Sequence, residues 1–154
     1  MNKWTRINYH PNLPLGANGT RVTASPDHIR LSRDVAREGM VLLKNEGGVL
    51  PLARGAKVAL FGKGTFDYVK GGGGSGDVTV PYVHNLSDGM HAYGDRVSVF
   101  EETDAFYRAH VNASYAAGRD PGAVEEPELS DALVKRASAF ADVAMHSVRA
   151  WPSA

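Results

Sequence analysis

The residues best suited to chemistry lie in one glycine-rich segment, residues 70–77, which reads Lys-Gly-Gly-Gly-Gly-Ser-Gly-Asp and holds five of the 17 glycines. It follows a predicted strand by a few residues, where open α/β sheets place ligand loops. Bare glycines let backbone approach a ligand closely, and the Ser75 hydroxyl both donates and accepts hydrogen bonds. The composition fits a shaped ligand loop or a flexible linker, and the flanking Lys70 and Asp77 favour the loop.

Phosphate binding is a poor fit to this segment. A Walker loop needs Lys and then Ser or Thr directly after its last glycine, and Asp77 stands there instead. Its carboxylate would repel a phosphate. The pair Gly62 and Gly64 lacks the third glycine of a dinucleotide-binding turn, with Asp67 in its place. The sequence therefore supports neither a phosphate-binding Walker loop nor a dinucleotide-binding turn.

Metal and thiol chemistry are also poorly supported. The chain has no cysteine, so it has neither a disulfide nor a thiolate nucleophile. None of its histidines pairs at metal-ligand spacing with a carboxylate, and His110 is expected to be a partly buried packing residue. We therefore expect no metal and no cofactor.

Hydrolytic signatures within the chain are weak. Gly74-Ser75-Gly76 is shorter than the Gly-x-Ser-x-Gly turn that exposes a serine nucleophile. The adjacent carboxylates Glu101/Glu102 are interpreted as solvating charge because neighbouring residues on a helix point apart, and Glu125/Glu126 because they lie in a charged loop.

The composition is that of a soluble globular protein without a strong overall electrostatic field. Its 154 residues are the size of one domain, and 17 basic residues balance 17 acidic ones. Nucleic acid and membrane are therefore not expected as partners. No apolar run follows Met1, so the predicted location is cytoplasmic.

The elements that must position the segment alternate between helix and strand. Residues 1–24 are predicted to be an extended arm. A helix should begin with Ser25 as N-cap and Pro26 in the first turn, continue to Leu43 with one buried face, and end near Asn45. Residues 57–62 form a continuous apolar run, as in a strand buried on both faces.

The second half continues the alternation. Helices are predicted over 83–93 and 101–117, with a strand at 96–100 between them, and residues 118–127 should form a mobile loop. Ser130 caps a further helix to residue 141, with an inward face, and a strand opens at Val143. The inward residues expected on the two later helices are Phe106, His110, Ala113 and Ala117, and Leu133, Ala137 and Phe140. This order predicts a layered α/β sandwich with a mostly parallel sheet, helices on both faces, and an incomplete domain.

Five strings in order carry a resemblance to a known family. They are Glu-Gly-Met-Val-Leu-Leu-Lys-Asn (38–45), Leu-Pro-Leu (50–52), Lys-Val-Ala-Leu-Phe-Gly (57–62), Gly-Gly-Gly-Ser-Gly-Asp (72–77) and Leu-Ser-Asp-Gly-Met (86–90). Together they resemble glycoside hydrolase family 3, the β-glucosidases, in the α/β sandwich often called the C-terminal domain. The resemblance implies a partial sandwich over 25–148, a non-family tail at 149–154, and a subgroup in which a (β/α)8 barrel follows the sandwich.

The resemblance implies hydrolysis of O-glycosyl bonds in carbohydrate metabolism, by two carboxyl groups about 5 to 5.5 Å apart. In similar enzymes the nucleophilic aspartate belongs to the barrel. The acid/base glutamate follows the strand equivalent to residues 141–145, in a Ser-Gly-Glu-Gly motif that residues 146–154 do not reproduce. The expectation is a truncated fragment that carries no catalytic residue and is inactive alone.

The same resemblance points to a sugar contact. In similar enzymes the serine of the Gly-Ser-Gly-Asp loop reaches the glucose subsite, which here implies Ser75 with Gly74, Gly76 and Asp77. The expected partners are a β-glucoside or other small sugar and the missing barrel. Two alternatives stay open: a free-standing carbohydrate-binding or interaction module, and one half of a split enzyme complemented by a separate barrel.

Overall fold

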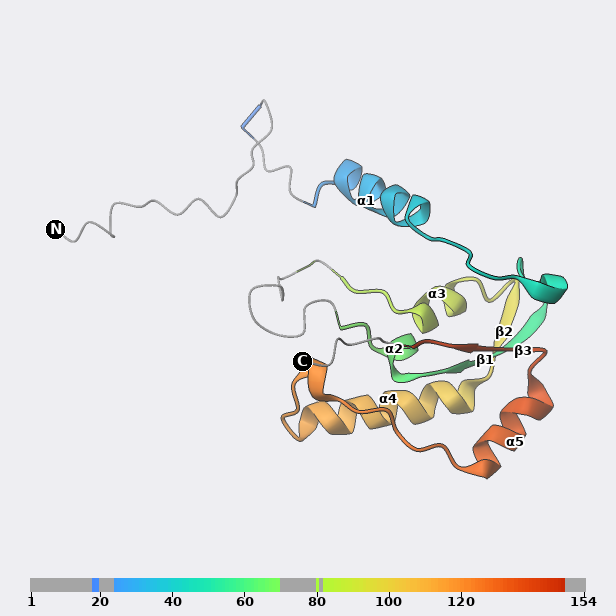
Figure 1. Ribbon diagram of the computed structural model, residues 1–154. Coiled ribbons are helices and arrows are strands. Elements are labelled where there is room, and N and C mark those ends of the chain that lie inside the picture. Colours follow the sequence, from blue (N-terminus) through green and yellow to red (C-terminus); the bar gives the residue numbers. More distant parts are fainter. Residues whose placement is uncertain (1–17, 20–23, 70–79, 81, 149–154) are drawn as a thin grey trace. The chain divides into compact units, whose positions relative to one another are not determined.

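The computed structural model describes residues 18–19, 24–69, 80 and 82–148. The chain divides into two compact units, with the boundary between Gly47 and Gly48 (Figure 1). Most of the predicted arm and the whole of the predicted tail at 149–154 lie outside the described residues. No helix within the described ranges is long and apolar enough to cross a membrane.

The first unit contains α1 (Pro26–Glu38), which begins as predicted. The Ser25 side chain accepts a hydrogen bond from the backbone N–H of His28 at 3.3 Å, and proline occupies the first turn. These two residues leave little choice about where the helix starts.

The predicted end of α1 is wrong. The helix stops at Glu38, and Gly39 caps it by donating its N–H to the carbonyl of Val35 at 2.9 Å. Glycine inside a helix costs about 1 kcal/mol relative to alanine, so a spaced apolar pattern did not carry the helix past it. No residue of α1 is buried, and the segment that follows exposes large apolar side chains, with Leu43 91% exposed.

The second unit is built on three parallel strands in the order β2-β1-β3. The strands are β1 (Ala56–Phe61), β2 (Val97–Val99) and β3 (Val143–His146). The central strand pairs Ala56 with Val97 on one side and Phe61 with His146 on the other. Lys57 is exposed, but Val58, Ala59 and Leu60 are at most 1% exposed, which confirms a strand buried on both faces.

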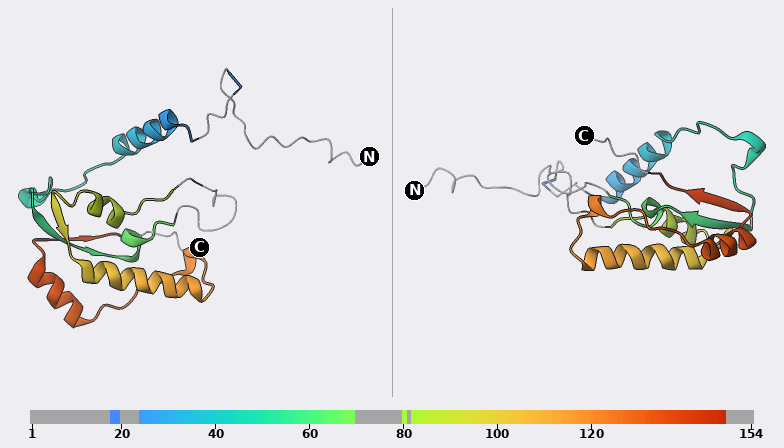
Figure 2. Two further views of the ribbon diagram at one scale, coloured as in Figure 1. Left: turned by 180° about the vertical axis from the view of Figure 1, so that it is seen from behind. Right: turned by 60° about the horizontal axis from the view of Figure 1, so that its bottom comes forward.

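Helices cover both faces of this sheet (Figures 1 and 2), as predicted. The connection from β1 to β2 carries α2 (Lys63–Phe66) and α3 (Leu86–Ala92), and α3 lies on the opposite face from α4 (Glu101–Ala116) and α5 (Asp131–Phe140). Short 3-10 turns span Glu46–Gly48 and Pro121–Ala123. Because the chain leaves β1 in one direction and returns across it to β3, right-handed crossovers require opposite faces.

Alternate residues of β1 supply two buried clusters. Val58 and Leu60 pack in the first, and Ala59 packs in the second with Leu133 and Ala137 of α5. The first cluster also contains Phe66, Val97 and Tyr107, and the second contains Phe100. The inward residues predicted for α5 are therefore confirmed, with Phe140 half-buried at the edge.

The predicted buried face of α4 is only partly right: Phe106 packs against both buried clusters and His110 is half-buried, but the fully buried residues are others. The buried residues are Thr103, Asp104, Tyr107 and Val111, whereas Ala113 and Ala117 are exposed. Two of the four buried side chains are polar and gain hydrogen bonds inside the fold, so hydrophobicity alone did not reveal this face.

The connection between α4 and α5 is anchored and not simply solvated. Val124 is 4% exposed, and the Glu126 carboxylate accepts a hydrogen bond from the backbone N–H of Lys63 at 2.8 Å. The predictions of a mobile loop and of a purely solvating Glu126 are therefore corrected.

Candidate functional site

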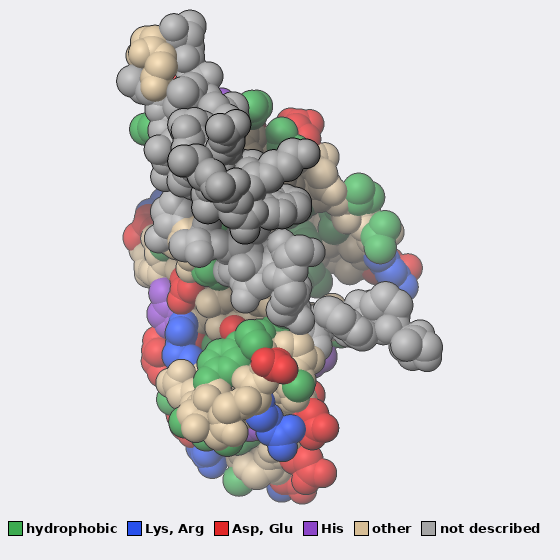
Figure 3. Space-filling model, turned by 90° about the vertical axis from the view of Figure 1, so that its left-hand side faces the viewer, with side chains coloured by type: hydrophobic (Ala, Val, Ile, Leu, Met, Phe, Trp, Pro, Cys, Tyr) green, Lys and Arg blue, Asp and Glu red, His purple; other side chains and the backbone are tan. Residues whose placement is uncertain are grey.

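A cavity of about 640 Å³ opens at the carboxyl ends of β1 and β3. The crossover that leaves β1 and the crossover that reaches β3 lie on opposite faces, which makes the gap between these neighbouring strands the switch point where open α/β sheets bind ligands. Figure 3 views this end of the molecule and shows acidic and basic side chains close together in its lower part. The charged and polar lining residues are Lys63, Asp67, Arg119, Glu125, Glu126, His146 and Ser147.

Glycine at position 62 allows the two strand ends to meet. Gly62 has φ +85°, and a Cβ atom there would lie 2.4 Å from the carbonyl oxygen of Ser147, the residue after β3. The Ser147 N–H donates to the carbonyl of Phe61 at 3.1 Å, so pairing continues one residue past the end of β3. Any side chain at Gly62 would meet both backbone strain and backbone atoms.

Lys63 is the most buried charge at the cavity, with its side chain 6% exposed. Its Nζ lies 2.9 Å from Asp67 Oδ2, one helical turn later, and donates to the carbonyl of Pro121 at 3.2 Å. Since a buried ammonium needs such partners, Lys63 serves to fasten α2 to the loop before α5. The one-turn helix α2 was not predicted from the sequence.

Asp67 has a second partner on α4. The hydroxyl of Tyr115 donates to Asp67 Oδ2 at 2.7 Å. Burial, and then the adjacent carboxylate, raise the pKa of Tyr115 above its ordinary value, so it stays a neutral donor. Asp67 is thus held by a cation and a phenol and is not poised for acid–base work.

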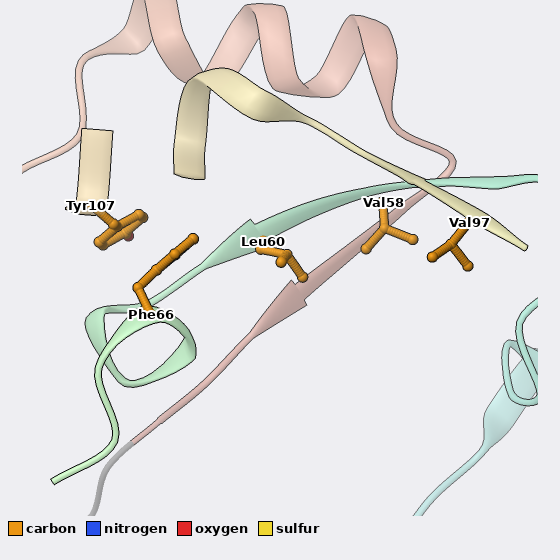
Figure 4. Close-up of a cluster of buried hydrophobic side chains, with 5 residues drawn as sticks. All are labelled: Val58, Leu60, Phe66, Val97 and Tyr107. Carbon is orange, nitrogen blue, oxygen red and sulfur yellow. The ribbon is translucent and has the colours of Figure 1, made fainter. Parts of the chain in front are cut away.

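Tyr107 of α4 has its ring stacked on Phe66, 4.7 Å between centroids (Figure 4). Its hydroxyl is buried and makes no hydrogen bond with any described residue. Burial raises the pKa of Tyr107 to about 12, while the Gly62 backbone and Glu126 lie near enough to act on it without meeting hydrogen-bond geometry.

A second polar cluster joins α3 to α4 and was not predicted. The fully buried Ser87 hydroxyl donates to Asp104, and Arg108 donates to Asp104 at 2.6 Å, to Ser87 at 3.1 Å and to Asp88 at 3.0 Å. The backbone N–H of Asn85 and the Arg108 guanidinium lower the pKa of Asp88. The only sequence hint is the Asp104/Arg108 spacing of one helical turn.

This cluster contains serine, histidine and aspartate but is not a hydrolytic triad. His91 Nδ1 lies 2.8 Å from the Ser87 carbonyl oxygen, which accepts a hydrogen bond from its N–H. The Ser87 hydroxyl lies 3.4 Å from the same nitrogen but donates to Asp104. In a triad the hydroxyl would donate to the imidazole and be open to substrate. The Ser87 carbonyl, and more weakly Glu101 and Asp104, raise the pKa of His91 against the opposing effect of burial.

The predicted sugar contacts Ser75, Gly74, Gly76 and Asp77 lie outside the described residues. The chain that leads to them is described up to residue 69, and Asp67 in this stretch lines the cavity. His110 is half-buried and its Nε2 is 2.9 Å from the carbonyl of Glu125, in keeping with a packing role. Among the described residues no group of His, Asp and Glu could hold a metal ion.

Comparisons with known proteins agree on one family. Residues 40–154 match the glycosyl hydrolase family 3 C-terminal domain. The chain is 54% identical to β-glucosidase A of Butyrivibrio fibrisolvens over 148 residues, which is 96% of this chain and 18% of that protein. It is 35% identical to a β-glucosidase of Ruminococcus albus over 125 residues, 77% of this chain and 13% of that protein.

Solved structures give the same result. β-Glucosidase 3B from Thermotoga neapolitana, in complex with α-D-glucose, superposes with a TM-score of 0.67 at 28% identity and covers 83% of this chain and 18% of that one. A β-glucosidase from Paenibacillus barengoltzii superposes with a TM-score of 0.67 at 32% identity, over 79% of this chain and 14% of that one. The chain therefore spans less than a fifth of the relatives it matches. This chain belongs to glycoside hydrolase family 3 and corresponds to the family's C-terminal α/β domain.

Proposed function

We propose that the chain is the sugar-contacting α/β part of a β-glucosidase-type glycosidase, which hydrolyses O-glycosyl bonds in carbohydrate metabolism. The observation that carries this proposal is the cavity at the β1/β3 switch point, from whose Asp67 the chain runs into the glycine-rich segment. In this proposal Ser75, with Gly74, Gly76 and Asp77, contacts a β-glucoside or another small sugar. The catalytic carboxylates belong to a barrel partner.

The described carboxylates at the cavity support this division of labour. Asp67 is bound to Lys63 and Tyr115, and Glu126 accepts the Lys63 backbone N–H. A retaining glycosidase needs one carboxylate free to attack the sugar and another free to transfer a proton. Of the three described carboxylates that line the cavity, only the Glu125 side chain has no partner among the described residues, so the site lacks a free pair and we propose that the chain alone is inactive.

The experiment compares the 154-residue chain alone, a separately produced family barrel alone, and their mixture, with an aryl β-glucoside as substrate. Hydrolysis only in the mixture is expected. Hydrolysis by the isolated chain at the rate of the mixture would contradict the proposal.

A free-standing carbohydrate-binding module is the second candidate, favoured by the charged and polar side chains among the residues that line the cavity. Saturable binding of glucose at millimolar concentration, with no activity gained on adding a barrel, would support the module over the enzyme part. The cytoplasmic location also stays a prediction, and cell fractionation would test it.

A further inference from the structure

A second cavity, of about 420 Å³, opens at the amino ends of β1 and β2, which is the end of the sheet opposite to the candidate site. This volume lies within the range of cavities that bind small organic molecules. The cavity is formed by the segment before β1, the end of α3 and the turn before β2. Its lining includes an apolar part, Leu52, Met90 and Val97, and a part with polar groups, Arg54, Tyr93 and Arg96.

The apolar part of this lining is continuous with the core. Val97 is 9% exposed and belongs to the buried cluster that contains Val58 and Leu60, and Leu52 and Met90 pack half-buried against the same cluster. Moving an apolar group from water onto such a surface is favourable. The cavity can therefore hold the apolar part of a ligand.

Backbone hydrogen bonds hold the two arginines at the same cavity. The N–H of Gly55, directly after Arg54, donates to the carbonyl of Arg96. The N–H of Arg96 in turn donates to the carbonyl of Tyr93 at 2.7 Å and fixes the turn before β2. Both guanidinium groups are thus carried by backbone segments that are bonded to each other.

These two guanidinium groups share one weak carboxylate partner. Asp95 Oδ2 lies 3.8 Å from Arg54 Nη2 and 4.0 Å from Arg96 Nε, and both distances exceed that of a hydrogen bond. Neither guanidinium has another partner in the part of the chain that the structure describes. The three side chains together carry one excess positive charge. A guanidinium binds a carboxylate strongly, often through two parallel N–H donors.

We propose that this cavity is a binding site for a small monocarboxylate with an aromatic or aliphatic body. The carboxylate accepts hydrogen bonds from Arg54 and Arg96, and the body lies against Leu52 and Met90. The Tyr93 ring, 57% exposed, gives the body a further apolar contact. An inorganic anion would leave the apolar lining in water, and a neutral sugar would leave the excess charge unpaired. The proposal is independent of the sugar contact, which concerns the other end of the sheet.

Titration of the 154-residue chain with phenylacetate, followed by amide NMR spectra, tests this site. We expect saturable binding that shifts the signals of Gly55 and Gly94, next to the lining residues, and leaves that of Gly118 after α4 unmoved. Neutral phenylacetamide should bind at least about 5-fold more weakly, because it lacks the charge that the arginines attract. Acetate should bind about 10-fold more weakly or less tightly still, because it has no body to bury.

Two variants test the arginines directly. Arg54→Gln and Arg96→Gln should each raise the Kd for phenylacetate about 5-fold, the upper range for one exposed ion pair. The matched control is Arg136→Gln, which removes the same charge from α5 on the other face of the sheet and should leave the Kd unchanged. Melting curves identify any variant that has lost its fold.

Three results would overturn the proposal. One is the absence of saturable phenylacetate binding by the unaltered chain, or binding that leaves Gly55 and Gly94 unmoved. Another is equal affinity of the chain for phenylacetate and either phenylacetamide or acetate, because the charge or the body would then contribute nothing. The last is folded Arg54→Gln and Arg96→Gln variants that bind phenylacetate as tightly as Arg136→Gln does.

Discussion

Replacing Gly62 by alanine tests whether the switch point depends on close approach of β1 and β3. The new Cβ would lie 2.4 Å from the Ser147 carbonyl oxygen and 2.9 Å from its hydroxyl, with φ at +85°. Backbone strain of this kind costs about 1–3 kcal/mol. Relieving the overlap must also part the strand ends and weaken the Ser147-to-Phe61 hydrogen bond, which adds about 1 kcal/mol. The expected loss in the free energy of unfolding is about 2–4 kcal/mol.

Urea unfolding at neutral pH measures this loss, and two other glycines separate its causes. Gly118 has φ +76° with nothing within 4 Å, so Gly118→Ala reports backbone strain alone. Gly89 lies inside α3 with nothing within 4 Å, and Gly89→Ala should stabilise by up to about 1 kcal/mol. If Gly62→Ala costs no more than Gly118→Ala, the close approach of the strand ends does not govern this position and the reasoning fails.

Two further predictions concern single titratable side chains. Tyr107→Phe removes a buried hydroxyl that has no described partner, so we expect the free energy of unfolding to rise by about 1 kcal/mol in thermal or urea melts. If the free energy of unfolding falls by that amount instead, the hydroxyl has a hydrogen-bond partner such as water. The pKa of His91 is raised, so its contribution to stability is fully present below the unfolded value of about 6.5 and disappears as pH rises through the folded value. Because His91 is partly exposed, we expect His91→Ala to lower the free energy of unfolding by under about 1 kcal/mol at pH 5.5, and by less at pH 8.5, in paired urea titrations. An equal loss at both pH values would contradict this assignment.

Sequence patterns that depend on near neighbours predicted the fold well. The Ser130 side chain accepts from the Leu133 N–H at 3.3 Å, as expected of an N-cap, and the apolar run at 57–62 became the buried central strand. Local hydrogen bonding and continuous hydrophobicity have the same meaning in almost any fold. The family strings also led to the correct family, which the comparisons confirm.

Features that join distant residues could not be predicted in this way. Arg108 contacts Asp88 and Ser87 from 20 and 21 residues away, and Glu126 caps Lys63 from 63 residues away. The polar part of the buried face of α4 was missed for the same reason, because Thr103 and Asp104 are buried only where the fold provides partners.

The sequence by itself therefore determined the alternation of helices and strands, the starts of its capped helices and the family to which the chain belongs. The tertiary structure decided which carboxylates form ion pairs or hydrogen bonds, which face of α4 is buried and where the candidate site opens. The physical reason is that capping and hydrophobic runs act over a few residues, whereas the pairing of buried charges and the β2-β1-β3 order depend on contacts between residues far apart in the chain.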